Sequence, residues 1–302
     1  MYNHLCYICR CDGIGRRSGL KIHRQRWRTG SSPVTGTKTK DTSKDVSFVL
    51  KRTLPKGEIY MELDLLQIIF LILIGAGAGF VQRVAGFGLG IFAMLFLPYL
   101  MPSGVVVVVA CLLSCCTSSY NAVKYRKNIH FATMLPPLVA ALAVIPVMVR
   151  FSATVPEEQL KLMLGAALII LSIYFIFFSK RIHIRPSVPA GLLCGIMGGT
   201  MSSLFSMGGP PIVLYLVHAL KDKTAYFATI QFYFAINNIY TTVVRAANGI
   251  ITGQMLLISA IGLVGCLAGN RIGGLVFDKL DSEKIKLVIY IGMIVSGVLM
   301  IL

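Results

Sequence analysis

Apolar runs of about the length of a membrane span recur along this chain from Leu63 onward. They hold roughly 16–22 residues each, and crossing the hydrocarbon core of a bilayer takes roughly 20. Short charged or Pro/Gly-rich stretches separate them. Hydrophobic residues make up 56% of the chain and charged residues 14%, far from the profile of a soluble globular domain. The sequence therefore predicts an all-α polytopic membrane protein.

We expect ten hydrophobic elements, of which the second and the seventh are short and interrupted by Gly and Pro. These two are candidates for re-entrant half-helices. The approximate ranges are 64–82, 85–101, 104–123, 131–150, 160–179, 188–206, 208–220, 225–245, 250–270 and 284–302. No stretch after Met61 is long enough to form a separate soluble domain.

Residues 1–60 have a different composition and are predicted to form a basic, disordered arm. They hold 13 of the 29 Lys and Arg residues but only 4 of the 12 acidic ones, so the formal net charge of the remaining chain is +8 instead of +17. A basic arm can bind nucleic acid or anionic lipid. Cys6, Cys9 and Cys11, with His4 and His23 nearby, do not match the spacing of paired zinc-ligand knuckles and supply at most half a site.

The arm has a simpler explanation in the nucleotide sequence behind it. Residues 15–37, GRRSGLKIHRQRWRTGSSPVTGT, resemble a translated transfer-RNA gene, and residues 30–33 can be encoded by a sequence like the T-arm of such genes. Met61 then opens MELDLLQIIFLILIG, a typical start of a bacterial membrane protein. We therefore expect Met61 to be the native first residue. Absence of a transfer-RNA cloverleaf under codons 10–38 would contradict this.

An internal repeat emerges when the two halves of the chain are aligned at an offset of 120 residues. The aligned pairs include Gly79 and Gly199, Gln82 and Ser202, Gly88 and Gly208, and Asn128 and Asn248. Because each copy has five elements, an odd number, the second copy enters the membrane in the opposite sense. We predict two inverted transmembrane repeats, residues 61–182 and 183–302.

The positions of the loop cations support the inversion. Basic residues follow the third, fifth and seventh elements, whose loops share one face, and the positive-inside rule makes that face cytoplasmic. They are Lys124, Arg126, Lys127, Lys180, Arg181, Arg185, Lys221 and Lys223. The loop after the eighth element has only Arg245, which we therefore expect in an external loop.

Two stretches break the hydrophobic pattern in matching places of the repeats: QRVAGFGLGIFAM (82–94) and SSLFSMGGPPIVL (202–214). In hydrocarbon every backbone N–H and C=O must be satisfied, so a broken helix is tolerated only where it faces protein or a water-filled cavity. The freed N–H groups form a natural anion site, and glycine lets a ligand approach the backbone closely. Matching breaks in inverted repeats indicate a substrate site near the membrane midplane. The alternative is that the glycines only allow close helix packing.

The motifs GAGAGFVQRVAGFGLG in the first half and GIMGGTMSSLFSMGGPP in the second resemble the two glycine motifs of the sulfite exporter TauE/SafE family. The resemblance covers residues 65–302. It implies a multi-pass transporter of the bacterial inner (plasma) membrane that exports a small sulfur-containing anion, such as sulfite or a sulfonate. A secondary carrier and a potential-driven uniporter both fit. Arg83 departs from the family pattern, in which a small residue follows the glutamine. An anion channel and an importer of a small organic anion remain as alternatives.

The expected substrate-binding residues lie at the two breaks and at polar positions of the third and eighth elements. They are Gln82, Arg83, Gly86, Gly88, Asn121, Ser202, Ser203, Ser206, Gly208, Gly209 and Gln231. An intramembrane arginine is costly and usually functional, although Arg83 could also end its helix and extend to the interface. The neutral donors can bind an oxyanion without a full charge. Asn237 and Asn238 could line the same cavity, and plain hydrogen bonding between helices would also explain each of these side chains.

Other classes of function have less support in the residues. No nucleophile lies in a constellation with a base and carboxylates, so we expect no enzyme, and without a P-loop we expect no direct ATP coupling. The membrane cysteines behave as small hydrophobes, so we expect no metal or cofactor. Acidic residues after Asp64 all lie in predicted loops or at helix ends, which argues against coupling through an intramembrane carboxylate. The expected partners are a small anion and the lipid bilayer, with no nucleic acid, and the sequence leaves a homo-oligomer open.

Overall fold

The computed structural model describes residues 64–174, 176, 186–276 and 282–301, and the side chains of 276–290 are outside this description. The basic arm, Met61 and the loop cations Lys180, Arg181 and Arg185 lie outside the described residues. All described residues belong to one compact unit.

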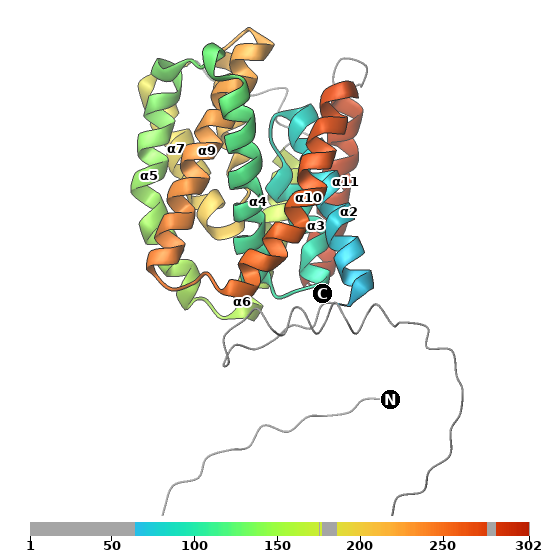
Figure 1. Cartoon of the computed structure of the whole chain (residues 1–302). Helices are drawn as coiled ribbons and strands as arrows, with labels where there is room; N and C mark the ends of the chain where they lie inside the picture. The colour runs from blue at the N-terminus through green and yellow to red at the C-terminus, as the bar shows by residue number, and fades with distance from the viewer. Residues whose placement is uncertain (1–63, 175, 177–185, 277–281, 302) are drawn as a thin grey trace, which may run out of the picture. The chain divides into compact units, whose positions relative to one another are not determined.

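Each of the ten predicted hydrophobic elements overlaps one α-helix, and the described regular structure is entirely helical (Figure 1). The helices are α2 (Leu65–Ala85), α3 (Leu89–Phe96), α4 (Ser103–Lys124), α5 (Phe131–Thr154), α6 (Glu157–Ile173), α7 (Val188–Phe205), α8 (Gly209–Ala219), α9 (Lys223–Ala247), α10 (Gly253–Val276) and α11 (Ser282–Ile301). The second and seventh elements, α3 and α8, are the shortest. At a rise of about 1.5 Å per residue, neither is long enough to cross a bilayer.

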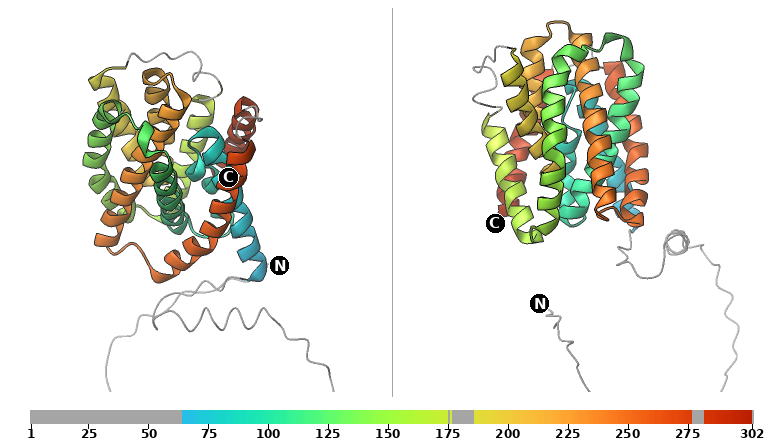
Figure 2. Two further views of the ribbon diagram at one scale, coloured as in Figure 1. Left: turned by 45° about the horizontal axis from the view of Figure 1, so that its top comes forward. Right: turned by 90° about the vertical axis from the view of Figure 1, so that its left-hand side faces the viewer.

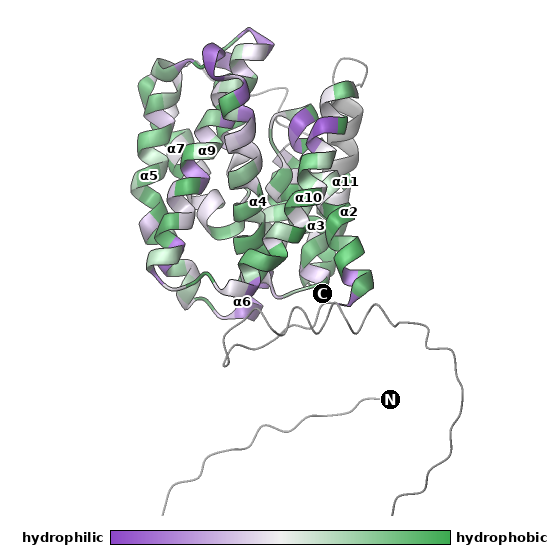
Figure 3. Cartoon of the chain, in the orientation of Figure 1, coloured by the Kyte–Doolittle hydropathy of each residue, from purple (hydrophilic) through white to green (hydrophobic). Residues whose placement is uncertain are grey.

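Five of the described helices are long and apolar enough to cross a membrane: α2, α4, α5, α7 and α10. Hydrophobic residues cover the bodies of the helices, and hydrophilic residues gather in the loops (Figure 3). Large apolar side chains such as Leu66, Leu73 and Phe70 of α2 are exposed, which suits contact with lipid tails. The chain is a polytopic membrane protein.

The main contacts between helices come in matched pairs. α2 packs against α10 and α7 against α5; α4 packs against α10 and α9 against α5; α2 packs against α3 and α7 against α8. Two further contacts, α4 with α9 and α6 with α11, join one helix from each half. The halves are therefore interlocked, and α4 and α9 lie at their junction (Figure 2).

Glycines allow the closest of these contacts. A Cβ atom on Gly79 of α2 would lie 2.1 Å from the carbonyl oxygen of Cys266 in α10, and one on Gly265 would lie 2.0 Å from that of Ile72. In the matching contact, a Cβ on Gly195 of α7 would lie 2.2 Å from the carbonyl oxygen of Pro137 in α5. These glycines serve close packing, as small residues do between membrane helices.

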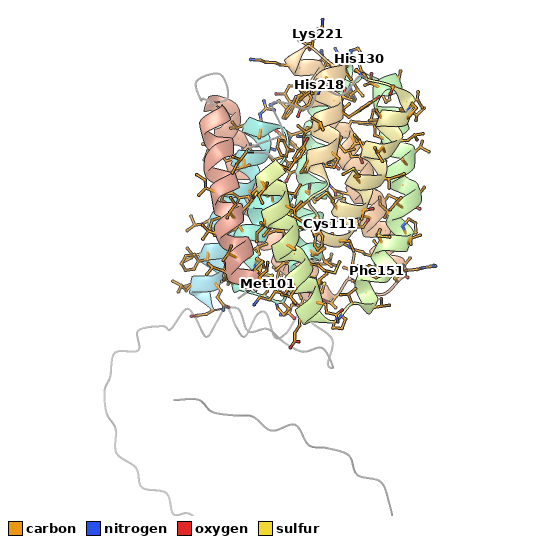
Figure 4. All side chains as sticks on the ribbon, turned by 180° about the vertical axis from the view of Figure 1, so that it is seen from behind. Met101, Cys111, His130, Phe151, His218 and Lys221 are labelled. Carbon is orange, nitrogen blue, oxygen red and sulfur yellow. The ribbon has the colours of Figure 1, made fainter. Side chains whose placement is uncertain are left out.

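The two ends of the helices differ in chemistry. His130, His218 and Lys221 gather at one end, and Met101 and Phe151 lie at the other (Figure 4). The first, which holds the α4–α5 and α8–α9 loops, is here named the basic end, and the second is named the opposite end.

Alanine at Gly79 should destabilise the protein, because its methyl group would collide with the backbone of α10. Overpacking of this kind costs about 1–3 kcal/mol. Gly292 of α11 is the control, since its nearest neighbour would be a flexible Leu95 methyl group at 3.6 Å. We expect Gly79→Ala to lower the melting temperature of the purified protein by several degrees, and Gly292→Ala to leave it unchanged or raise it. Equal melting temperatures for the two variants would contradict the α2–α10 contact.

Candidate functional site

The two helix breaks are built by backbone conformations that ordinary helices avoid. α2 ends at Ala85, and Gly86 and Gly88 then take left-handed φ values of +79° and +102°, which favour glycine because it has no Cβ. α7 ends at Phe205, and Ser206 also has a positive φ, +55°. The chain then reverses into α3 and α8.

The breaks contact each other directly, although they lie 120 residues apart in the chain. A Cβ atom on Gly90, in the first turn of α3, would lie 1.8 Å from the carbonyl oxygen of Ser206. A Cβ on Gly209, the first residue of α8, would lie 3.0 Å from the ring of Phe87. The two breaks therefore pack directly against each other.

A small cavity lies between the breaks. Its volume is about 20 Å³, near the roughly 10–15 Å³ that one water molecule needs. It is lined by Gln82, Phe87, Gly88, Leu89, Gly90, Ile91, Ser114, Ser202, Ser206, Met207, Gly208, Gly209, Phe234 and Asn238. Ser114 lies near the middle of α4, so the cavity is about midway between the two ends. We name it the central cavity.

Both short helices begin at this cavity, and no side chain caps either of them. Leu89, Gly90 and Ile91, the first three residues of α3, all line it, and the first N–H groups of a helix have no partner within that helix. In α8 the first turn contains Pro210 and Pro211, which have no N–H to donate. The α3 terminus therefore offers more backbone donors than the α8 terminus.

Gln82 is the centre of a buried hydrogen-bond network beside the cavity. Its Nε2 donates to Ser118 Oγ at 2.9 Å and to Gln231 Oε1 at 3.1 Å. Gln231 Nε2 in turn donates to the carbonyl oxygen of Gly86 at 2.8 Å, which satisfies a backbone group freed by the break. The Oε1 atom of Gln82 is buried without a protein partner. Such an acceptor is suited to a water molecule or to a ligand that carries a proton.

The helix α9, the counterpart of α4 in the second half, supplies a second set of amide side chains. Asn238 Nδ2 donates to Ser114 Oγ at 2.9 Å, and both residues line the central cavity. Asn237 Nδ2 donates to Ser202 Oγ at 2.6 Å. The polar faces of α4 and α9 therefore face each other across the junction of the two halves.

Arg83 lies in a second, larger cavity at the basic end, with a volume of about 380 Å³. Its guanidinium lies over the rings of Tyr125 and Phe227, with its central carbon 5.0 and 4.8 Å from the ring centroids, and Nη2 donates to Tyr125 Oη. Asn121, Lys124, Asn270 and Arg271 also line this cavity. We name it the basic-end cavity.

The expectation that Arg245 lies in an external loop is wrong. The α9 helix extends to Ala247, so Arg245 falls in its last turn, and its side chain is only 2% exposed. Nη1 donates to the carbonyl oxygen of Val107 at 3.1 Å and Nη2 to that of Ser203 at 2.7 Å. The sequence could have shown that Gln231, Asn238 and Arg245 share one helix face, because about two helical turns separate each from the next.

The structure brings most of the expected site residues together. Six line the central cavity: Gln82, Gly88, Ser202, Ser206, Gly208 and Gly209. Gly86 and Gln231 are joined to Gln82 by hydrogen bonds. Arg83 and Asn121 lie in the basic-end cavity, and the Ser203 hydroxyl donates to Gly199 of its own helix. Sequence reasoning missed Ser114, although its spacing from Ser118 and Asn121 places all three on one face of α4.

Among the residues that the structure describes, no group of three or more His, Cys, Asp or Glu side chains could hold a metal ion. The site consists of amides, hydroxyls and helix termini, with arginine nearby at two places. This arrangement can bind a small oxyanion through neutral donors.

Apolar membrane helices around a small cavity with polar lining residues, with two broken helices beginning at it, are typical of membrane transport proteins. The family comparison agrees with this class: the model of the family described as "Sulfite exporter TauE/SafE" matches residues 71–300, so the chain belongs to that family. No curated protein and no solved structure matches the chain.

Replacing Asn238 by alanine should impair transport, because it removes a donor at the central cavity and leaves Ser114 without that partner. A buried polar group without its partner costs about 1–3 kcal/mol, enough for roughly tenfold or more in flux. Asn248→Ala is the control, because this exposed residue lies just beyond the same helix and bonds only to its own Val244 carbonyl. Equal flux through both variants in proteoliposomes, at equal protein content, would contradict the site.

Proposed function

We propose that this protein exports a small sulfur-containing oxyanion, such as sulfite or a sulfonate, across the bacterial inner membrane. The observation that carries the proposal is the meeting of two broken helices, both beginning at one small cavity with polar lining residues midway along the protein. The membership in a sulfite exporter family supports the substrate class. The two further steps below concern the route of the anion and the energy that drives it.

Two inverted repeats, residues 61–182 and 183–302, are part of this proposal. The paired helix contacts support it. The contacts of α2 with α10, α4 with α10 and α2 with α3 match those of α7 with α5, α9 with α5 and α7 with α8. Hydrogen bonds match as well: Gln82 pairs with Ser118 in the first half, and Ser202 pairs with Asn237 in the second, within one residue of the 120-residue offset. Inverted repeats allow one half to rock against the other around a fixed site.

The central and basic-end cavities suggest the route of the anion. The central cavity is too small for an oxyanion of four or more heavy atoms, so it must widen before the anion can occupy it. The basic-end cavity is larger and holds three cationic side chains, Arg83, Lys124 and Arg271, which attract anions and raise their local concentration. The positive-inside rule places the basic end in the cytoplasm. The anion therefore enters from the cytoplasm and leaves at the opposite end.

Two of the described carboxylates bind backbone N–H groups at the starts of helices. Asp222 accepts a hydrogen bond from the backbone of Ala225 at 2.7 Å and so caps α9. Glu157 accepts bonds from the backbone N–H groups of Ser103 and Gly104, at the start of α4. None of the residues lining the central cavity is acidic. A transporter built in this way needs no proton or cation, because an anion leaving a cell that is negative inside is driven by the potential itself.

Anion flux through the purified protein should follow the membrane potential. Each elementary charge moved outward gains about 2.3 kcal/mol per 100 mV, roughly a fiftyfold concentration ratio. In proteoliposomes, a potential imposed with potassium and valinomycin should accelerate sulfite flux towards the positive side. Flux should also saturate with sulfite concentration, as expected for a carrier and not for an open channel.

The matched control is the same vesicle preparation with an imposed pH or sodium gradient at zero potential, which should not accelerate the flux. Flux that ignores the potential but follows either gradient would overturn the uniport mechanism. Sodium-driven flux would then indicate that backbone carbonyls at the breaks bind the cation.

A further inference from the structure

Arg245 is a buried charge that the proposed route has not yet used. Its side chain is 2% exposed, and its partners are two backbone carbonyl oxygens, those of Val107 and Ser203. No Asp or Glu forms an ion pair with it among the residues that the structure describes. Carbonyl groups carry no net charge, so the positive charge of Arg245 is solvated but not neutralised. An arginine in a membrane protein normally faces a polar cavity and has an anionic partner there.

A third cavity meets Arg245 at the opposite end of the protein. Its volume is about 280 Å³, and Arg245, Ser152, Glu157 and Met255 are among the residues that line it. Glu157 is the one carboxylate among its described lining residues, and it is held by the start of α4, where Oε1 and Oε2 accept the N–H groups of Ser103 at 2.5 Å and Gly104 at 3.3 Å. We name this space the opposite-end cavity. Arg245 is the one cation that the described part of the chain contributes to its lining.

A single carbonyl group connects this cation to the central cavity. Ser206, at the break after α7, donates from Oγ to the carbonyl oxygen of Val107 at 2.7 Å, and Arg245 Nη1 donates to the same oxygen at 3.1 Å. Ser206 lines the central cavity and Arg245 lines the opposite-end cavity. An anion that leaves the central cavity towards the opposite end therefore reaches Arg245 next, because Ser206 and Arg245 bind the same carbonyl oxygen.

The two arginines occupy related positions in the two halves. At the 120-residue offset, positions 83 and 125 align with positions 203 and 245. Arg83 contacts Tyr125 in the first half, and Arg245 contacts Ser203 in the second, so the same two positions touch in both halves. The arginine comes from α2 in one contact and from α9 in the other. The inversion places the two contacts at opposite ends.

Their separation matches the thickness of a membrane. Arg245 binds α4 at Val107, and Arg83 binds the end of α4 at Tyr125, 18 positions further along. At about 1.5 Å per residue this is roughly 27 Å, close to the roughly 30 Å of the hydrocarbon core. One arginine therefore lies near each face.

We propose that Arg245 forms a second anion-binding site, at the opposite-end cavity, which takes the same class of small oxyanion on its way out. The proposal rests on the proposed function, since it supplies the exit side of the same path. When the anion arrives, the guanidinium exchanges one or both carbonyl partners for the anion oxygens. Such charge-assisted bonds are stronger than those to neutral carbonyls.

The test measures half-saturation separately from each face of the membrane. Sulfite is supplied to sealed right-side-out and inside-out vesicles carrying the wild type, Arg83→Gln, Arg245→Gln or Arg150→Gln. The last is the control, because Arg150 is an exposed cation that precedes Phe151 near the opposite end. Removing a charged hydrogen-bond donor should raise half-saturation roughly tenfold or more where that donor meets the anion.

We expect Arg245→Gln to raise the half-saturating sulfite concentration from the opposite end and to leave it within about twofold from the basic end. Arg83→Gln should do the reverse, and Arg150→Gln should change neither. A purely structural role for Arg245 would lower transport equally from both faces, and that result would overturn the proposal. An unchanged Arg245→Gln variant would also overturn it.

Arg245→Lys keeps the test decisive if the glutamine variant does not accumulate in the membrane. Lysine retains the charge but not the planar fork of donors, so half-saturation should rise severalfold from the opposite end alone. No change, or an equal change from both faces, would contradict the site. Saturable wild-type sulfite flux with unaltered Arg245 variants would reject this inference alone, whereas a wild type that moves no sulfite would reject the proposed function and this inference with it.

Discussion

The contact between the two helix breaks is the feature on which the rest of the structure depends. At each break the backbone loses helical hydrogen bonds, and in a membrane protein those groups must find partners within the protein. The polar face of α9 provides one partner through Gln231, which donates to Gly86. At the α7 break the backbone N–H of Met207 donates to the carbonyl oxygen of Met201, and Arg245 of α9 donates to that of Ser203. The central cavity exists because α4 and α9 carry polar groups to the level at which the short helices begin.

Glycine has two distinct roles here, and the distinction separates packing from the site. Gly79, Gly195 and Gly265 lie in regular helices, where a methyl group would strike the backbone of a neighbouring helix. Gly86 and Gly88 have left-handed backbone conformations. These would be strained in a residue with a side chain, whatever space surrounds it. The glycines of one motif therefore divide between close helix packing and the helix breaks at which we propose the binding site.

The sequence was sufficient for the helices because length and apolar composition determine them almost alone in a membrane. The ten predicted ranges each overlap one helix, and the short second and seventh elements are short in the structure. The depth of polar residues was harder to predict. Arg245 appeared to end its helix because charge usually marks a membrane boundary, yet α9 continues past it and tertiary contacts bury it. Ser114 was missed because its spacing from Ser118 and Asn121 marks a polar face of α4 but does not name the partner of that face, which is Asn238.

The distribution of charge along the path has a physical logic of its own. Described residues around the central cavity contribute amides, hydroxyls and helix termini, whereas Arg83 and Arg245 lie towards the two ends. A full positive charge at the centre would bind an anion tightly in a place with little water to help release it. Transport requires binding that is favourable enough for entry and weak enough for departure. In the proposed path, neutral donors between two cationic ends satisfy both demands, because each arginine would stabilise the anion only towards one face.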